Sequence, residues 1–96
     1  MNTVNLIIVA KINPAEKEAL NQYLEGVAKL YQEVGAQSIN KYKVSEASIG
    51  DYSPSIVSIM QFRDRDSLDN VFESTAYQAL IPLRDKAFLK VESYIS

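Results

Sequence analysis

The amino-acid sequence predicts an α+β fold with the element order β-α-β-β-α-β. Three observations lead to this prediction. Four segments have the composition or alternation of strands, two have apolar residues at helical spacing, and the first and third strands are apolar on both sides. The 96 residues have the length of one domain, which we expect to span residues 1–96.

The first strand and the first helix are predicted from residues 4–34. Residues 4–12 are rich in β-branched side chains and predict a strand. Asn13 is expected to cap the helix, with Pro14 at its first position and Glu16 at its third. Apolar residues at steps of three or four then predict one buried stripe, which comprises Leu20, Tyr23, Leu24, Val27, Leu30, Tyr31 and Val34. We expect Gly35 to end the helix.

The middle of the chain is predicted to form two strands joined by a loop. Residues 37 to about 47 alternate and predict a strand with one face in water. Residues 48–55, SIGDYSPS, contain Gly50-Asp51 and Pro54, which are typical of a loop or a long hairpin turn. Residues 56–63, IVSIMQFR, predict the third strand.

A second helical region is predicted after the third strand. Asp66 is expected to cap it, with Asp69 three residues later, and Ser74-Thr75 marks an interruption or a restart. Because these acidic residues, together with Asp64, are explained by helix capping, we expect no metal site there.

Pro82 lies within the helical spacing of Tyr77, Leu80 and Arg84. Proline lacks an amide hydrogen, and its ring clashes with the carbonyl group of Gln78, four residues earlier. We therefore expect the helix to end near Leu80 or to kink there, so that a new turn beginning at Pro82 redirects Arg84. Residues 88–95 alternate and predict the last strand.

Two right-handed crossovers in this order interleave, which places the first and third strands at the centre of the sheet. The predicted architecture is ferredoxin-like: a four-stranded antiparallel sheet with two helices on one face. The predicted central strands are the most apolar, whereas the predicted edge strands carry Lys41, Lys43, Lys90 and Glu92.

The sheet face without helices is predicted to be apolar as well. Both sides of the central strands carry apolar residues: in the first strand Leu6, Ile8 and Ala10 point one way and Ile7 and Val9 the other, and in the third strand Ile56, Met60 and Phe62 lie on one side and Val57 and Ile59 on the other. Each such side chain left in water forfeits about 1.5–3 kcal/mol. We therefore expect a homodimer through this sheet face, in which two sheets close into a dimeric α+β barrel. A monomer with an apolar sheet face is the alternative.

Composition and charge exclude several functions. The net charge is −2 and the ten Lys and Arg residues are scattered, so we expect no nucleic-acid partner. The absence of cysteine and histidine excludes thiolate chemistry, histidine-ligated zinc or haem, and a Ser-His-Asp relay within one chain. We expect no cofactor. The N-terminal apolar run is about half as long as a membrane span, so we expect no membrane partner and a cytoplasmic location.

One segment carries a resemblance to a known family. STAYQALIPLRDKA follows the strand SIVSIMQF and the helix onset DRDSLDNVF. It resembles the C-terminal signature of the domain-of-unknown-function family numbered thirteen-thirty, which lies within the dimeric α+β barrel superfamily. The residues that carry the match are Tyr77, Gln78, Leu80, Leu83 and Arg84. The resemblance implies a homodimer with a cavity in each subunit and an uncharacterised function.

Arg84 and Tyr77 are the first candidates for binding a ligand. Arg84 could hold a carboxylate or a phosphate with two hydrogen bonds. The simpler interpretation is an ion pair with Asp85, with Glu73 or with a carboxylate of a partner chain. Tyr77 could donate its hydroxyl to a ligand, although a tyrosine on an apolar stripe is commonly a core residue.

Tyr42, Asn40 and Arg63 are further candidates for a cavity between the sheet and the helices. Each lies on or beside a predicted strand. A shift of one residue in register would turn each side chain to the opposite face, so the sequence leaves their direction open.

Three functions remain compatible with the sequence. The first is a dimer that binds a small aromatic or acidic molecule in a cavity of each subunit. The second, implied by the resemblance, is an enzyme like the cofactor-independent monooxygenases and isomerases of the superfamily, for which the sequence identifies no catalytic residue. The third is a structural or regulatory dimer without a ligand.

Overall fold

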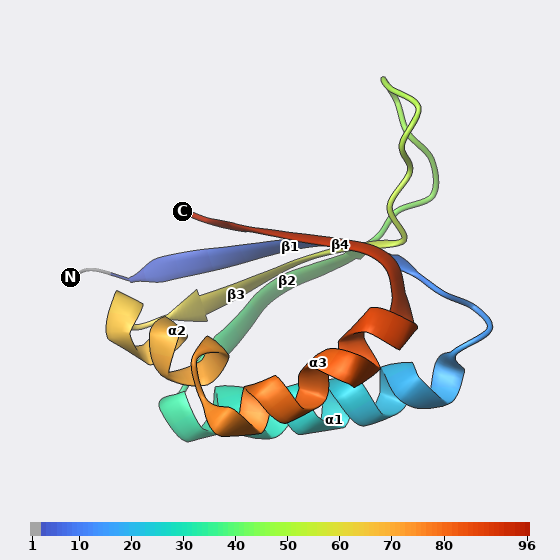
Figure 1. Cartoon of the computed structure of the whole chain (residues 1–96). Helices are drawn as coiled ribbons and strands as arrows, with labels where there is room; N and C mark the ends of the chain where they lie inside the picture. Colours follow the sequence, from blue (N-terminus) through green and yellow to red (C-terminus); the bar gives the residue numbers. More distant parts are fainter. Residues whose placement is uncertain (1–2) are drawn as a thin grey trace.

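The computed structural model describes residues 3–96 as one sheet with three helices on one of its faces (Figure 1). The elements are β1 (Val4–Ile12), α1 (Lys17–Val34), β2 (Gln37–Lys43), β3 (Ile56–Phe62), α2 (Arg65–Phe72), α3 (Thr75–Ala87) and β4 (Phe88–Ile95). All strand pairs are antiparallel and the strand order is β2-β3-β1-β4. The predicted architecture and the central position of the first and third strands are confirmed, and the second helical region is divided into α2 and α3.

The register of the central strands fixes which residues face the helices. Leu6 of β1 pairs with Met60 of β3 on one side and with Ile95 of β4 on the other. Since neighbouring partners share a face, Leu6 and Ala10 lie on the helix side, where both are buried. Ile7 and Val9 pair with Ile59 and Val57, and these four residues lie on the opposite face. We call this opposite face the open face.

Two apolar clusters join the helices to the sheet. Phe62, Leu68 and Val71 form the first with Leu6, and Tyr23, Val27 and Tyr77 form the second. Between α1 and α3, a Cβ atom added to Gly26 would lie 2.6 Å from Cδ2 of Leu80. The glycine therefore permits the close contact between these two helices.

The start of α1 corrects the prediction for Asn13. The helix begins at Lys17 instead of Pro14. The Asn13 side chain accepts a hydrogen bond from the amide of Ala15 at 3.1 Å, so it stabilises a turn that precedes the helix. At the other end Gly35 has φ 72°, the left-handed conformation predicted for the cap.

The start of α2 corrects the predicted cap. Asp64, and not Asp66, is the N-cap, and its carboxylate accepts a hydrogen bond from the amide of Ser67 at 2.8 Å. This bond lowers the pKa of Asp64. Asp69, predicted to complete the cap, instead lies 3.0 Å from Nε of Arg65.

The helix that contains Pro82 is continuous, and the predicted end near Leu80 is wrong. Ser74 caps α3 by accepting a hydrogen bond from the amide of Tyr77 at 3.1 Å, which confirms a restart at Ser74-Thr75. The helix then runs through Pro82 to Ala87. The carbonyl group that Pro82 leaves without an intrahelical donor belongs to Gln78, an exposed residue that water can reach.

The second strand is shorter than predicted. β2 ends at Lys43, and a register shift between Ser38 and Asn40 interrupts its alternation. Residues 44–55 form a loop that rises from the sheet on the side away from the helices (Figure 1). Among residues 3–96, no helix has both the length and the apolar character that a membrane crossing requires.

Candidate functional site

An apolar cavity lies between the helix side of the sheet and α1. It has a volume of about 230 Å³, and its apolar lining includes Ile8, Leu20, Val27, Met60 and Phe88. Ser38 and Lys41 of the edge strand β2 also line it. An apolar cavity of about 150 Å³ is enough to hold benzene, so this volume suits one ring with its substituents.

A second, more polar cavity adjoins the first. It has a volume of about 190 Å³ and is lined by Tyr77 and Arg84 of α3 and by residues 91–93 of β4. Tyr23 and Tyr31 of α1 line both cavities. The two volumes therefore form the apolar and the polar end of one candidate site, with the tyrosines of α1 where they meet.

Three polar side chains form a hydrogen-bonded row at the polar end. The hydroxyl oxygens of Tyr23 and Tyr77 lie 2.9 Å apart, and Nη1 of Arg84 donates to the Tyr77 hydroxyl at 3.3 Å. Tyr77 and Arg84 are seven residues apart, about two turns of a helix. The continuity of α3 therefore places both side chains on the same face of that helix.

Arg84 is only partly neutralised. Its Nη2 lies 3.5 Å from a carboxylate oxygen of Asp85, which is one of the ion pairs predicted for it. Its Nε is buried and has no hydrogen-bond partner among the described residues. Burial alone would lower the pKa of Arg84, but the hydrogen bond to Tyr77 and the charge of Asp85 raise this pKa above its ordinary value, so the guanidinium stays charged.

The two tyrosines of α1 are held in their protonated form. Burial raises the pKa of Tyr23, and its hydrogen bond with Tyr77 raises that pKa further. Burial also raises the pKa of Tyr31, whose ring packs edge-on against Phe62 and Phe72. At neutral pH these hydroxyls can donate hydrogen bonds but are poor bases.

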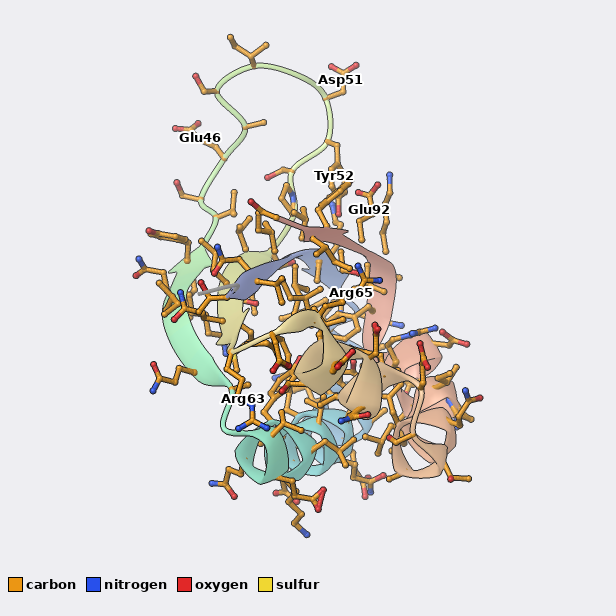
Figure 2. All side chains as sticks on the ribbon, turned by 90° about the vertical axis from the view of Figure 1, so that its left-hand side faces the viewer. Glu46, Asp51, Tyr52, Arg63, Arg65 and Glu92 are labelled. Atoms are coloured by element: carbon orange, nitrogen blue, oxygen red, sulfur yellow. The ribbon has the colours of Figure 1, made fainter. Side chains whose placement is uncertain are left out.

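The structure brings together two of the five candidates from the sequence, Arg84 and Tyr77. Tyr42 and Asn40 pair with Val57 and Ile59, so both lie on the open face and not between the sheet and the helices. Arg63 follows β3; its side chain is 80% exposed and lies 3.7 Å from Asp64 (Figure 2). Neither cavity is lined by any of these three. Whether any of the five binds a ligand stays a prediction.

Sequence reasoning assigned Tyr23 to the core and missed its place in the row. The available signal was a buried tyrosine whose hydroxyl needs a partner.

Among residues 3–96 there is no cluster of three or more acidic side chains that could hold a metal ion.

Comparison with protein families gives one match. The profile of the family described as "Domain of unknown function (DUF1330)" matches residues 6–92. No curated protein matches the sequence.

Solved structures match over almost the whole chain at low sequence identity. A protein of unknown function from Rhodopseudomonas palustris superposes with a TM-score of 0.87 and 12% identity, over 99% of this chain and 81% of that one. A dimeric protein of unknown function with a ferredoxin-like fold, from Bacteroides fragilis, gives 0.63 and 11%, over 100% and 96%. The cofactor-independent oxygenase SnoaB from Streptomyces nogalater gives 0.68 and 12%, over 100% and 92%. At such identities the likeness shows the fold.

Proposed function

Because the chain belongs to the DUF1330 family, which is defined without a function, we propose a function from the geometry of its own cavity. The protein binds a small carboxylic acid with an aromatic or apolar body, one molecule in each subunit of a homodimer. The carboxylate lies beside Arg84 and the apolar body fills the cavity under α1.

The observation that carries this proposal is the buried, unpartnered Nε of Arg84 beside a cavity. A buried donor without an acceptor costs about 1–3 kcal/mol, and more when the group is charged. A carboxylate at the polar end would accept from this Nε–H and from a second donor nearby. The arginine would then have a partner for each buried donor.

A count of hydrogen atoms supports an acceptor-rich ligand. The bond between Tyr23 and Tyr77 uses one of their two hydroxyl hydrogens, and Arg84 supplies its own hydrogen to Tyr77. One tyrosine hydroxyl is therefore left to donate, whichever direction the bond between the tyrosines takes. Together with the Nε–H of Arg84, the site offers at least two donors and one positive charge. A monoanion that accepts two hydrogen bonds fits this set better than an amine or a dianion.

The state of the tyrosines favours binding over acid–base chemistry. Burial raises the pKa values of Tyr23 and Tyr31, so neither forms a phenolate that could remove a proton near neutral pH. The likeness to SnoaB nevertheless makes a cofactor-independent oxygenase the second candidate. Oxygen uptake in the presence of an acid that binds distinguishes the two, because a binding protein consumes none.

The test compares acids with their neutral amides. Phenylacetate and hexanoate are titrated into the protein by isothermal calorimetry, beside phenylacetamide and hexanamide. We expect the acids to bind at least about tenfold more tightly, since a hydrogen bond to a charged group contributes about 1.5–3 kcal/mol. Arg84→Gln should remove this preference.

Arg63→Gln is the matched control, because it removes an arginine charge outside both cavities. Its affinities should equal those of the unmodified protein. If no acid binds at millimolar concentration, or if Arg84→Gln binds acids as well as before, the proposal is wrong. A structural or regulatory dimer without a ligand would then be the remaining interpretation.

The homodimer is the second part of the proposal, and the composition of the open face supports it. Ile7, Val9, Val57 and Ile59 form a continuous apolar block across the two central strands of this face. Such a block is typical of a protein interface. A two-fold contact between two open faces would cover it in both subunits. The similar protein from Bacteroides fragilis is dimeric, which adds support. The cytoplasm remains the predicted location of the chain.

A further inference from the structure

The loop of residues 44–55 does not pack onto its own sheet over most of its length. It rises from the ends of β2 and β3 on the side of the open face (Figure 1). Figure 2 shows its two limbs, marked by Glu46 and Asp51, standing above the sheet, while the helices lie below it. The loop therefore extends into the space where a second subunit would lie.

The base of this loop is held by hydrogen bonds to its own sheet. The amide of Val44 donates to the carbonyl oxygen of Ser55 at 2.9 Å, and the amide of Ser55 donates to that of Ala10 at 2.8 Å. The hydroxyl oxygen of Ser55 accepts from the amide of Ile12 at 3.1 Å. Ser55 thus joins the loop to β1, and the direction in which the loop leaves the sheet is fixed.

One limb has a further contact on the open face. Nζ of Lys90 on β4 lies 4.7 Å from the centre of the Tyr52 ring, a cation–π distance. Lys90 pairs with Lys11 at the end of β1, beside the base of the loop. This contact stabilises the loop in its raised position.

The tip of the loop carries one large apolar side chain, that of Ile49. Ile49 is 95% exposed, and Gly50 beside it has φ 102°, which turns the chain back toward the sheet. A single exposed isoleucine needs no explanation by itself. Here it stands at the end of a fixed projection, on the same side as the apolar block of the open face. An exposed apolar tip and an apolar sheet face on the same side of the molecule are suited to contact with one partner.

We propose that residues 44–55 form an arm that reaches past the sheet of the second subunit and buries Ile49 against it. The inference rests on the proposed homodimer. Ile49 lies six positions after Lys43, an extended reach of at most about 20 Å. Two packed sheets lie about 10 Å apart. The arm is therefore long enough to pass the plane of the partner's sheet and to bring its tip against the edge of that sheet.

The charges of the arm are complementary to those at the edge of the partner's sheet. The arm contains Glu46 and Asp51 and no lysine or arginine. The edge strand β2 carries Lys41 and Lys43, both exposed. An acidic arm beside a basic edge brings opposite charges together. This attraction favours the orientation of the two subunits in which each arm lies beside β2 of its partner.

The first test measures the dimer dissociation constant of Ile49→Ser by sedimentation over a concentration series. We expect the dimer to weaken at least about tenfold, because each subunit loses a buried apolar contact. Leu24→Ser is the control, since Leu24 is also an exposed apolar residue (39%) but lies on α1, away from the open face. It should leave the constant unchanged.

The second test locates the tip. The chain has no cysteine, so Ile49→Cys introduces a single thiol that can carry a benzophenone photo-crosslinker. Illumination should give a covalent dimer on a denaturing gel, and mass spectrometry should identify partner peptides from the edge of the sheet. Lys29→Cys, exposed on α1, should give no covalent dimer.

The outcomes separate the arm from the dimer. Suppose that the unmodified protein dimerises, but that Ile49→Ser dimerises equally well and the photoproduct stays within one chain. The proposed contact of the arm with the partner is then wrong, and the proposed homodimer is retained. If the unmodified protein is a monomer, both are wrong. Ligand binding is measured independently and is affected by neither result.

Discussion

Tyr77 joins two polar groups inside a layer of apolar side chains. Its hydroxyl binds Tyr23 of α1 on one side and Arg84 of its own helix on the other. Its ring packs edge-on against Phe72, with 4.8 Å between the ring centres. A polar row of this kind rigidifies a core when its members have partners, and it becomes costly when one partner is lost. It also fixes where Arg84 meets the cavity.

Tyr23 and Tyr31 should titrate late, and this predicts the behaviour of the protein in alkaline solution. The pKa values of Tyr23 and Tyr31 lie above the ordinary 10.0 in the folded chain, chiefly through burial. The unfolded chain therefore releases these two protons at a lower pH than the folded chain. The contribution of these two tyrosines to the free energy of unfolding should be complete below pH 10 and should fall as the pH rises above it.

Absorbance at 295 nm, recorded beside circular dichroism, follows this titration. Tyr23 and Tyr31 should ionise only when the fold is lost. In Tyr31→Phe the late step should be smaller by one tyrosine. If Tyr23 and Tyr31 ionised while the fold persisted, the burial of these hydroxyls would be disproved.

At the residue scale the sequence predicted part of the site. Arg84 and Tyr77 were identified from the chemistry of their side chains, although the helix was expected to end or kink between them. Tyr23 was not, since its partner is 54 residues away and only the packing of α1 on α3 brings the two together. The direction of Tyr42 and Asn40 depended on the pairing of β2 with β3, which contains a register shift that no local pattern shows.

At the scale of single elements, the sequence indicated the right kind of helix start but not always the right position. Acidic and amide side chains lie near the starts of α1 and α2, and several of them can cap a turn equally well. Asn13 stabilises a turn before α1, and Asp64 caps α2 in the place predicted for Asp66. The choice among neighbouring candidates is made by where the preceding strand ends.

Pro82 offers a test of the continuity of α3. Pro82→Ala restores an amide that can donate to the carbonyl of Gln78 and replaces the residue least favourable to a helix with the most favourable one. The free energy of unfolding should rise, by up to about 3 kcal/mol. Urea denaturation followed by circular dichroism measures the change.

Pro14→Ala is the matched control for this experiment. Pro14 lies in the turn before α1, outside every helix of the described residues. Its replacement should therefore leave stability unchanged or lower it slightly, because an unfolded chain without that proline has more freedom. A loss of stability in Pro82→Ala would indicate that the proline shapes the helix in a way that the fold requires.

At the scale of the whole molecule the topology was predictable for a physical reason. The hand of the two crossovers and the apolar character of both faces of β1 and β3 allow only one interleaved arrangement. The strand order β2-β3-β1-β4 and the separation of Leu6 from Ile7 onto opposite faces are the result. The continuous helix through Pro82 was not predictable, because it depends on the contacts that hold α3 against α1.

The open face predicts the assembly. Ile59→Lys places a charge at the centre of this face, opposite Ile7, without touching the helix side of the sheet. Two such lysines would be buried without partners in a dimer, so dimerisation should weaken about a hundredfold or more. Sedimentation at micromolar concentration should give twice the chain mass for the unmodified protein and a single chain mass for the variant.

Ile59→Val keeps the face apolar and should remain a dimer. Circular dichroism of the lysine variant should still show the native fold, since the cavity and both core clusters lie on the other side of the sheet. If the unmodified protein sediments as a single chain throughout the micromolar range, the open face is not a dimer interface.

The pairing of β1 with β4 also has a consequence for the order of folding. β1 is the first strand of the chain, yet one of its two hydrogen-bonding edges pairs only with the last strand. The β2–β3 hairpin and the helices contain local contacts that form quickly, whereas this ladder closes the longest loop in the molecule. During synthesis on the ribosome, the backbone groups on this edge of β1 therefore stay unpaired until β4 has emerged. In that interval the unpaired edge can pair with strands of other nascent chains that are being made on the same mRNA.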